Sequence, residues 1–556
     1  MAQFNTLAEW QQLHAHSTEI QSLHLRDLFA DEPHRFPHYS IHAAGIFLDY
    51  SRNLITDQTC TLLLQLAHAR QLEQHRTDLF AGRYQPTSHP HPILYWQLRD
   101  SAYTQKLNSH SISQQTLIST MLPWAEQLRA EQWLGYTHKP IRHIVNVGIG
   151  GSELGVKMTT RALAAYSNHQ LTYDCLSNID CYHLNALLQR IDLERTLFIV
   201  CSKSFGTLET INHLKYLLSL YPESSQRQQH FIAVTAKPQR AIEQGITASR
   251  ILQIDEWVNG RFSICSAMGF MLAIAIGEAQ FKQFLAGAYA MDEHFRNAPL
   301  PHNMPVIMAL LDIWYSQFFG SQTQAILPYE DCLEYFPAYL QQASMESLGK
   351  QVNNQGEHVS HVTGNIVWGG LGNNGQHAYM QLLHQGHHLV PADFIVAQED
   401  LPNKKVSHNA FDVGQSALCT SNSNDNKTPM LATRREILLT NCISQAQALM
   451  QGRTLKEAYD YLQQQGYTAA AIEQLAPHLI VKGNRPSNIL FTKQITPHSL
   501  GALIALYDHK IFTTSALLDI QAYDQWGVEL GKSLTQSLAV TDIIQQLCKQ
   551  LSCTKT

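Results

Sequence analysis

From residue 143 the chain reads His143-Ile144-Val145-Asn146-Val147-Gly148-Ile149-Gly150-Gly151-Ser152. The first five residues form a short apolar run rich in β-branched types, which is typical of a buried strand. The glycines that follow let the backbone turn sharply and approach an anion closely, and a helix beginning there would offer free N–H groups. Many strand-to-helix turns carry glycine for packing alone, so this loop by itself is a weak signal of phosphate binding.

Similar apolar runs recur after this stretch, at residues 196–201 and 230–234 and again at 324–328 and 388–396. Segments of helical length separate these runs, and the alternation indicates βα units around a buried parallel sheet. Three prolines within residues 296–305 suggest a boundary between the two alternating regions. The fold class that we expect is therefore α/β, with two α/β sandwich domains of mainly parallel strands.

Both ends of the chain are expected to be mainly helical. The first part would be a helical N-terminal region packed on the larger domain, and the last part a helical arm. Between them we expect a first, smaller sandwich and a second, larger one. The expected bounds of the four parts are 1–115, 116–285, 286–510 and 511–556. A polar stretch at residues 421–427 is expected to be a surface loop.

The composition excludes several classes of protein. Of the 556 residues, 44% are hydrophobic and 15% are charged, which is typical of a soluble globular protein. The net charge of −6 gives no electrostatic argument for binding nucleic acid or a membrane surface. No apolar run reaches the ~20 residues that span a bilayer, and the first residues lack the features of a secretion signal. Ten cysteines without a Cys-x-x-Cys pair favour a reducing compartment, so we expect the cytoplasm.

A second polar loop follows the second apolar run and reads Cys201-Ser202-Lys203-Ser204-Phe205-Gly206-Thr207. It supplies three hydroxyl groups and one amine. Open α/β sheets bind ligands at the carboxyl ends of their strands, so this loop would face the glycine loop across one crevice. The alternative is a helix-capping serine beside a solvated lysine. Two such loops together favour a site for a monophosphate.

The C-terminal part reads Tyr523-Asp524-Gln525-Trp526-Gly527-Val528-Glu529-Leu530-Gly531-Lys532, which resembles the C-terminal signature of the glucose-6-phosphate isomerase family. Both polar loops resemble the flavodoxin-like sugar-isomerase (SIS) domain of that family. The family's first loop is Gly-Ile-Gly-Gly-Ser-Asp-Leu-Gly, and Glu153 replaces its Asp here. Its second is Ser-Lys-Thr-Phe-Thr-Thr-Gln-Glu-Thr, from which Ser204, Gly206 and Leu208 depart. The resemblance implies that the phosphate is held by Gly151, Ser152, Ser202, Lys203, Ser204 and Thr207.

An aldose–ketose isomerase needs a base above two adjacent carbons and a group that stabilises the enediolate oxygen. The run Met345-Glu346-Ser347-Leu348-Gly349-Lys350 resembles the family's Met-Glu-Ser-Asn-Gly-Lys, with Leu348 in place of Asn. The match implies that Glu346 is the catalytic base and that Gln342 contacts the sugar. Asn259-Gly260-Arg261-Phe262-Ser263 resembles the family's Gly-Gly-Arg-Tyr-Ser and implies that Arg261 stabilises the enediolate.

A hexose phosphate is mostly a closed ring, so an acid–base pair must open it first. Asn373-Asn374-Gly375-Gln376-His377-Ala378 resembles the family's ring-opening segment, and an imidazole can exchange a proton near neutral pH. The resemblance implies that His377 comes from the partner subunit of a homodimer and that Lys532 completes the ring-opening pair, with Gln525 lining the site. The implied activity is interconversion of glucose 6-phosphate and fructose 6-phosphate in glycolysis and gluconeogenesis.

Three other hypotheses remain open. A metal-dependent sugar isomerase is the nearest rival, since histidine pairs occur at residues 14 and 16, 89 and 91, and 387 and 388. None of these pairs has a carboxylate at metal-site spacing, and we expect neither a metal nor a cofactor. A sugar-phosphate sensor would bind without turnover, and would lack a base or a ring-opening pair. An isomerase of another phosphorylated aldose would keep all these residues.

Overall fold

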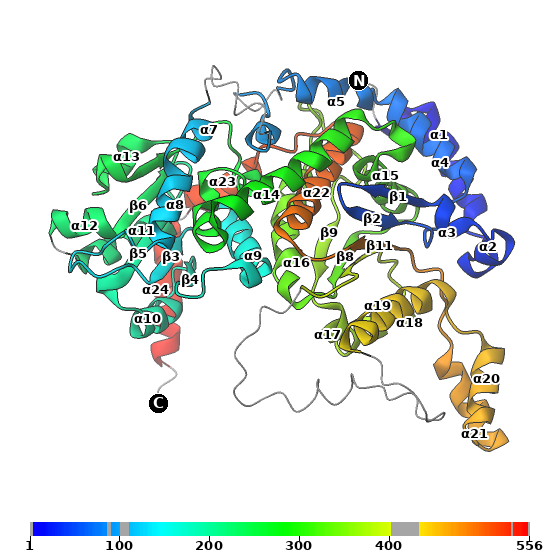
Figure 1. The fold of residues 1–556 in the computed structure, drawn as a ribbon. Helices are drawn as coiled ribbons and strands as arrows, with labels where there is room; N and C mark the ends of the chain where they lie inside the picture. The colour runs from blue at the N-terminus through cyan, green and yellow to red at the C-terminus, as the bar shows by residue number, and fades with distance from the viewer. Residues whose placement is uncertain are drawn as a thin grey trace, which may run out of the picture.

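The computed structural model is an α/β fold built on two sheets (Figure 1). It describes residues 4–85, 91–100, 111–221, 223–401, 433–534 and 538–553. The first sheet has five parallel strands, which are in spatial order β4 (Thr172–Leu176), β3 (His143–Val147), β5 (Thr196–Cys201), β6 (Phe231–Thr235) and β7 (Ile251–Gln253). The chain adds β4 on one side of β3 and then β5, β6 and β7 on the other side, so the strand order switches between β3 and β5. The loops after these two strands therefore meet at one edge of the sheet.

The second sheet is larger and mixed. In spatial order its strands are β1 (Ser40–Ala43), β2 (Ile46–Asp49), β11 (Ser487–Thr492), β10 (Ala392–Ala397), β8 (Thr323–Pro328) and β9 (Ile366–Gly369). The last four in this order are parallel, whereas β2 pairs antiparallel with both β1 and β11. A hairpin from the start of the chain therefore extends a sheet whose other strands come from residues 323–492.

Helices cover both faces of the first sheet, because both faces of its central strands are apolar. Ile144 belongs to the main core on one face, and Val145 belongs to a second apolar cluster on the other. The helices on the first face are α8 (Leu122–Arg129), α9 (Leu154–Ala162) and α14 (Phe270–Asn297). Those on the second are α10 (Cys181–Arg190), α11 (Leu208–Ser219), α12 (Ser224–His230) and α13 (Pro238–Glu243).

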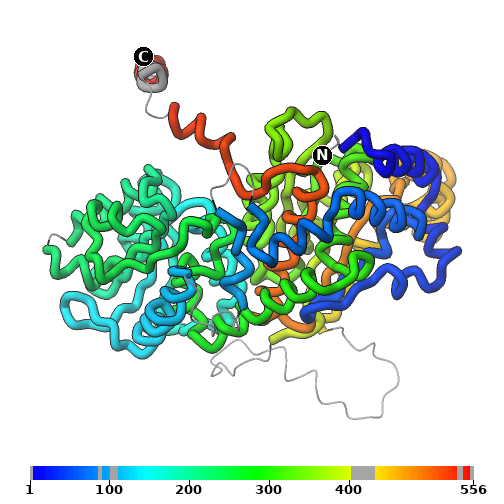
Figure 2. The backbone as a smooth tube through the Cα atoms, turned by 90° about the horizontal axis from the view of Figure 1, so that it is seen from above, coloured from blue at the N-terminus to red at the C-terminus, as the bar shows by residue number. Residues whose placement is uncertain are grey.

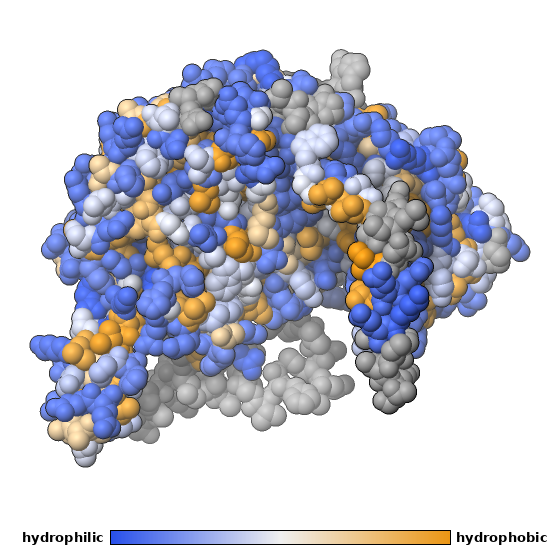
Figure 3. Space-filling view, turned by 180° about the vertical axis from the view of Figure 1, so that it is seen from behind, coloured by the Kyte–Doolittle hydropathy of each residue, from blue (hydrophilic) through white to orange (hydrophobic). Residues whose placement is uncertain are grey.

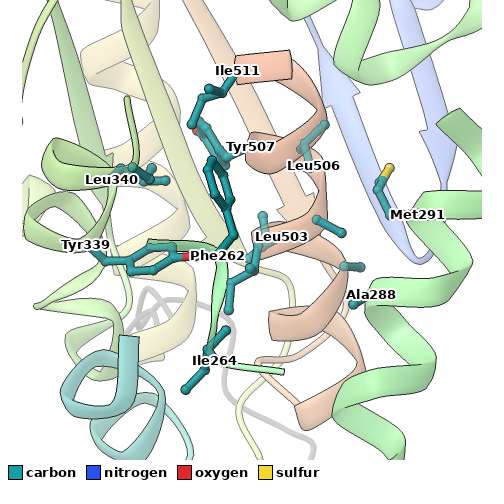
Figure 4. Packing of buried hydrophobic residues seen from close by; sticks show 14 of the residues in the cluster. Phe262, Ile264, Ala288, Met291, Tyr339, Leu340, Leu503, Leu506, Tyr507 and Ile511 are labelled. Carbon is teal, nitrogen blue, oxygen red and sulfur yellow. The ribbon is translucent and has the colours of Figure 1, made fainter. Parts of the chain in front are cut away.

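The second sheet is covered in the same way. One face meets α15 (Met304–Ile313), α16 (Phe336–Gln341) and α22 (Pro497–Leu518), and the other meets α18 (Met380–Gln385) and α19 (Arg434–Gln451). Helix α22 is buried over its whole length. Figure 4 shows Leu503 and Tyr507 of this helix close to Phe262 and Tyr339, which ties the central helix to the loops after the first sheet.

The central crossing of α14 and α22 depends on two glycines. A Cβ atom on Gly287 would lie 1.8 Å from the carbonyl oxygen of His498, and one on Gly501 would lie 2.0 Å from that of Phe284. The two backbones are therefore in direct contact, with no room for a side chain between them. This contact holds the core between the two sheets together.

The remaining helices lie at the ends and edges of the molecule. Near the N-terminus they are α1 (Ala8–Ile20), α2 (Leu25–Asp31), α3 (Arg35–His38), α4 (Asp57–Ala69), α5 (Leu72–Phe80) and α7 (Ile112–Thr116). Beside the second sheet are α17 (Gly372–Gln376), α20 (Leu455–Gln464) and α21 (Ala469–Leu475). The C-terminal helices α23 (Glu529–Leu534) and α24 (Leu538–Cys553) form an arm that stands away from the body (Figure 2). Within the described residues, no helix has the length and apolar character of a membrane span.

The expected fold class is confirmed: the chain forms two α/β sandwiches whose sheets are mainly parallel. All five expected strands are present, with β10 beginning later than residue 388. The expectation of a helical N-terminal region missed the hairpin β1–β2, because strands of four residues are too short to give a clear period. Residues 421–427, expected as a surface loop, lie outside the described residues. The bounds of the four proposed parts stay a prediction.

Candidate active site

The two polar loops meet at the carboxyl edge of the first sheet. A Cβ atom on Gly148 would lie 3.0 Å from the carbonyl oxygen of Cys201, so the two loops are in contact where they leave β3 and β5. In the first loop, Asn146 donates its side-chain amide to the carbonyl oxygen of Ser152 at 2.9 Å. This bond fixes the turn that brings Gly151 and Ser152 to the start of α9.

The second loop is a tight turn that gathers hydroxyl groups. The backbone N–H of Phe205 donates to the carbonyl oxygen of Ser202 at 3.2 Å, and Phe205 has a φ of 46°. This left-handed geometry is strained for a residue with a side chain and is found where the surroundings enforce it. The hydroxyl oxygens of Ser202 and Thr207 lie 3.2 Å apart across the turn, while Ser204 is exposed.

Lys203 is half-buried beside these hydroxyl groups. Burial lowers the pKa of its ammonium group, the carboxylate of Glu256 opposes this, and the cations of Lys237 and Arg261 lower the pKa further. Lys203 thus lies within electrostatic reach of Arg261, although the two come from different loops. A dianionic phosphate bound here would favour the charged form of the lysine.

The first loop packs backbone to backbone against the loop that carries Arg261. A Cβ atom on Gly151 would lie 2.3 Å from the carbonyl carbon of Gly260 and 2.7 Å from the backbone nitrogen of Arg261. The hydroxyl of Ser263 also lies 3.4 Å from the carbonyl oxygen of Gly151. A glycine at residue 151 is therefore what allows the anion loop and the arginine to lie side by side.

Arg261 is buried, with 4% of its surface exposed, and several acceptors hold its guanidinium in place. Its Nε donates to the hydroxyl of Ser347 at 2.7 Å, and its Nη2 donates to the carbonyl oxygens of Ala522 and, at 3.1 Å, Asp524. Burial lowers the pKa of this guanidinium, and the nearby carboxylate of Glu346 opposes that shift. The remaining Nη1 lies 3.6 Å from Oε1 of Glu346 and donates to the side chain of Gln525 at 3.3 Å.

Glu346 and Gln342 lie at the two ends of one π-helical turn after α16, Gln342–Glu346. The side chain of Glu346 is 23% exposed, so its carboxylate meets solvent while remaining beside Arg261. The side-chain nitrogen of Gln342 lies 3.1 Å from the point where Gly150 would carry a Cβ atom. The side chain of Gln342 therefore contacts the first loop from the π-helical turn.

A cavity of about 930 Å³ opens beside this turn. Its lining includes Glu346, Lys350, Asp524, Gln525 and Trp526, so the turn that carries Glu346 and the C-terminal signature face the same space. Lys350 joins them: its Nζ donates to the carboxylate of Asp524 at 2.8 Å and to the carbonyl oxygens of Asp524 and Glu346 at 2.6 and 3.1 Å. No role was expected for Lys350, although it is the last residue of the quoted catalytic run.

Of the expected site residues, Glu346 and Gln525 line this cavity, and two others lie apart from the site within one chain. His377 is exposed directly after α17, a helix that lies beside the second sheet (Figure 1). Lys532 lies on α23 with 64% of its side chain exposed and is paired with Glu529 at 2.8 Å. The other expected residues form one continuous site, from Gly151 through Arg261 to Glu346 and Gln525.

No metal site is evident in the part of the chain that the structure describes, where no three His, Cys, Asp or Glu side chains gather as ligands would. The polar groups around the two loops and Arg261 include hydroxyls, backbone amides and cations. Such groups suit an anion and a developing enediolate.

Comparison with known proteins supplies the family. The model of the phosphoglucose isomerase family matches residues 49–549. The glucose-6-phosphate isomerase of Ectopseudomonas mendocina is 43% identical over 535 residues, which cover 95% of this chain and 92% of that protein. The corresponding enzyme of Deinococcus deserti is 41% identical, over 95% and 93%. The crystal structure of a glucose-6-phosphate isomerase from Chlamydia trachomatis aligns over the whole of both chains with a TM-score of 0.80 and 27% identity. The chain belongs to the phosphoglucose isomerase family.

Proposed function

We propose that this chain interconverts glucose 6-phosphate and fructose 6-phosphate by moving a proton between C1 and C2 of the open-chain sugar. Membership of the family supports this activity. The observation that carries it is the pair formed by Glu346 and Arg261, 3.6 Å apart, because Glu346 lines a cavity and the backbone of Arg261 packs against the first polar loop at Gly151. A carboxylate and a fixed cation in this arrangement can abstract a proton and stabilise the charge that results.

The phosphate anchors the substrate at the carboxyl edge of the first sheet. The second loop brings the hydroxyl groups of Ser202 and Thr207 within 3.2 Å of each other, beside the ammonium of Lys203. The groups that we assign to this anchor are Gly151, Ser152, Ser202, Lys203, Ser204 and Thr207. Anchoring the phosphate places the reacting carbons at a set distance, towards Glu346 and Gln342.

Glu346 removes the proton from C2 of the aldose and returns it to C1, and the proton of the C2 hydroxyl moves to the oxygen on C1, which gives the ketose. In between, the electron pair forms the C1–C2 double bond of a cis-enediolate, whose oxygen charge Arg261 stabilises. Arg261 is prepared for this because Ser347 and two backbone carbonyl oxygens already fix its orientation. No reorganisation is then needed in the transition state.

Ring opening requires two residues that lie apart from Glu346 in a single chain. We infer a homodimer in which His377 is donated across the interface and Lys532 closes on the site with α23. The arm that carries Lys532 exposes large apolar side chains, and Figure 3 shows it projecting from the body. These side chains include Trp526, Leu530 and Leu534. Exposed apolar groups of this size commonly cover another protein surface.

The cellular setting follows from the reaction. We place the enzyme in the cytoplasm, in glycolysis and gluconeogenesis, where a hexose phosphate is both supplied and consumed. The buried cysteines Cys201, Cys265 and Cys442 are free thiols, which is in keeping with a reducing compartment.

The activity is tested by coupling fructose 6-phosphate conversion to a glucose-6-phosphate dehydrogenase. We expect turnover without added cofactor in the isomerase, and a loss of roughly 10³-fold in kcat for Glu346→Gln, within the usual contribution of acid–base catalysis. Glu334→Gln is the control, because its carboxylate is at the surface beside Arg161. Activity in Glu346→Gln within tenfold of the unchanged enzyme would contradict the assignment.

Donation of His377 is tested by mixing two inactive variants, Glu346→Gln and His377→Asn. If each site takes its histidine from the other chain, a mixed dimer has one intact site and one site with both changes. Random mixing should restore about one quarter of full activity, since half of the dimers are mixed. A mixture as inactive as its parents would mean that each chain uses its own histidine.

A further inference from the structure

Arg240 lies outside both polar loops, on helix α13, which follows the next strand of the first sheet. Its Nη1 donates to the carbonyl oxygen of Ser204 at 3.1 Å. That oxygen belongs to the peptide that enters Phe205, the residue with a φ of 46°. The guanidinium therefore binds the turn at its strained peptide.

All three carbonyl oxygens at the start of this turn accept hydrogen bonds from donors of the protein. The carbonyl oxygen of Ser202 accepts a hydrogen bond from the backbone N–H of Phe205, within the turn. The carbonyl oxygen of Lys203 accepts from residues at the end of β6, and the carbonyl oxygen of Ser204 accepts from Arg240. The donors to Lys203 are Ala236 N at 3.0 Å and Thr235 Oγ1 at 3.1 Å.

The backbone N–H groups of the same turn are used differently. Within the described residues, those of Lys203, Ser204, Gly206 and Thr207 have no acceptor. Carbonyls turned outward and N–H groups without acceptors are the arrangement of an anion-binding nest. A flip of the peptide after Ser204 would turn an oxygen towards the phosphate and spoil this arrangement.

The guanidinium lies beside Gly206 of the same turn. A Cβ atom on Gly206 would lie 3.6 Å from Nη1 of Arg240, an ordinary contact distance. Lys237, at the start of the same helix, is paired with Glu256 instead. Arg240 is therefore the cation of this helix that contacts the turn.

We propose that Arg240 is a positioning residue for the substrate phosphate: it holds the Ser204 carbonyl outside the turn, so that the neighbouring N–H groups point at the phosphate. Its guanidinium also adds positive charge where Gly206 leaves the turn uncovered. This inference rests on the proposed phosphate site and extends it to a residue of another helix.

The test is Arg240→Ala in the full chain, with inorganic phosphate titrated by calorimetry and fructose 6-phosphate kinetics measured in parallel. We expect the dissociation constant of phosphate and the KM each to rise about fivefold, a modest effect because the hydrogen bond is exposed. The kcat should stay within twofold, since Glu346 and Arg261 are untouched. Arg190→Ala is the control, because it removes the same charge from α10, where it pairs with Asp174.

A second variant separates positioning from general loss of charge. Adding Gly206→Thr to Arg240→Ala places a hydroxyl beside the freed carbonyl, and we expect it to recover part of the lost phosphate affinity. Arg240→Gln, which keeps a donor, should lose less affinity than Arg240→Ala. Unchanged phosphate affinity in Arg240→Ala, or a fall in kcat at constant KM, would overturn the inference. Phosphate titration does not depend on turnover, so failure of the proposed activity would be recognised separately.

Discussion

A methyl group on Gly151 would separate the first phosphate loop from Arg261. In Gly151→Ala the new Cβ atom would lie 2.3 Å from the carbonyl carbon of Gly260, whereas ordinary contacts begin near 3.4 Å. The difference between these distances requires the two backbones to separate by about 1.1 Å. Both sides of the contact are backbone, so no flexible side chain can move away to relieve it.

A displacement of this size acts directly on the reaction, because the phosphate anchor and the enediolate-stabilising cation would no longer be in register. A misplacement of ~1 Å can lower the rate of an enzyme about 100-fold. We expect kcat/KM for fructose 6-phosphate, measured in the coupled assay, to fall by roughly that factor. Gly155→Ala is the matched control four residues later, since its Cβ atom would meet Ile264 at 3.4 Å and Tyr339 at 3.6 Å.

The reasoning would be refuted by either of two results. One is a Gly151→Ala enzyme whose kcat/KM stays within fivefold of the unchanged enzyme. The other is an equal loss in Gly155→Ala, which would mean that any change in this segment is harmful. Thermal unfolding of both variants checks that the loss is local to the site.

Three further predictions concern the site and the core. Lys350→Met removes the three hydrogen bonds by which Lys350 joins Glu346 to Asp524. We expect kcat to fall roughly 10-fold with little change in KM. Lys350→Arg should recover part of the lost kcat. Because burial lowers the pKa of Lys203, its ammonium is lost as pH rises through a range below that of an ordinary lysine. The KM for fructose 6-phosphate should therefore rise at alkaline pH, and this rise should vanish in Lys203→Arg, whose guanidinium stays charged; equal profiles would contradict it. Gly501→Ala would place a Cβ atom 2.0 Å from a carbonyl oxygen of α14 and should destabilise the fold by about 1–3 kcal/mol in chemical unfolding, whereas Gly531→Ala, with nothing within 4 Å, should not.

Local sequence predicted the parts of the site that lie directly after strands. Gly151 and Ser152 could be placed at the edge of a sheet from the apolar run at residues 143–147 and the glycines that follow it. The run at residues 196–201 placed Ser202 in the same way. Both predictions depend only on the alternation of the elements and on the parallel direction of the strands.

Contacts between distant segments could not be predicted from such patterns. Arg261 is held by carbonyl oxygens of Ala522 and Asp524, more than 260 residues away, and backbone acceptors carry no signal in a sequence. Arg240 was missed for the same reason, since its partner is a main-chain oxygen. The residues for ring opening were recognised by resemblance alone, and no physical argument from one chain joins His377 to Lys532.

The N-terminal hairpin has a consequence for how the protein is made. Strand β2, which ends at Asp49, pairs with β11, which ends at Thr492, so its neighbour leaves the ribosome more than 400 residues later. Pairings of such separation form slowly, because a long loop must close first. The first sheet, by contrast, lies within residues 143–253 and can assemble while synthesis continues. The edge of β2 that pairs with β11 in the folded protein therefore stays unpaired through most of translation.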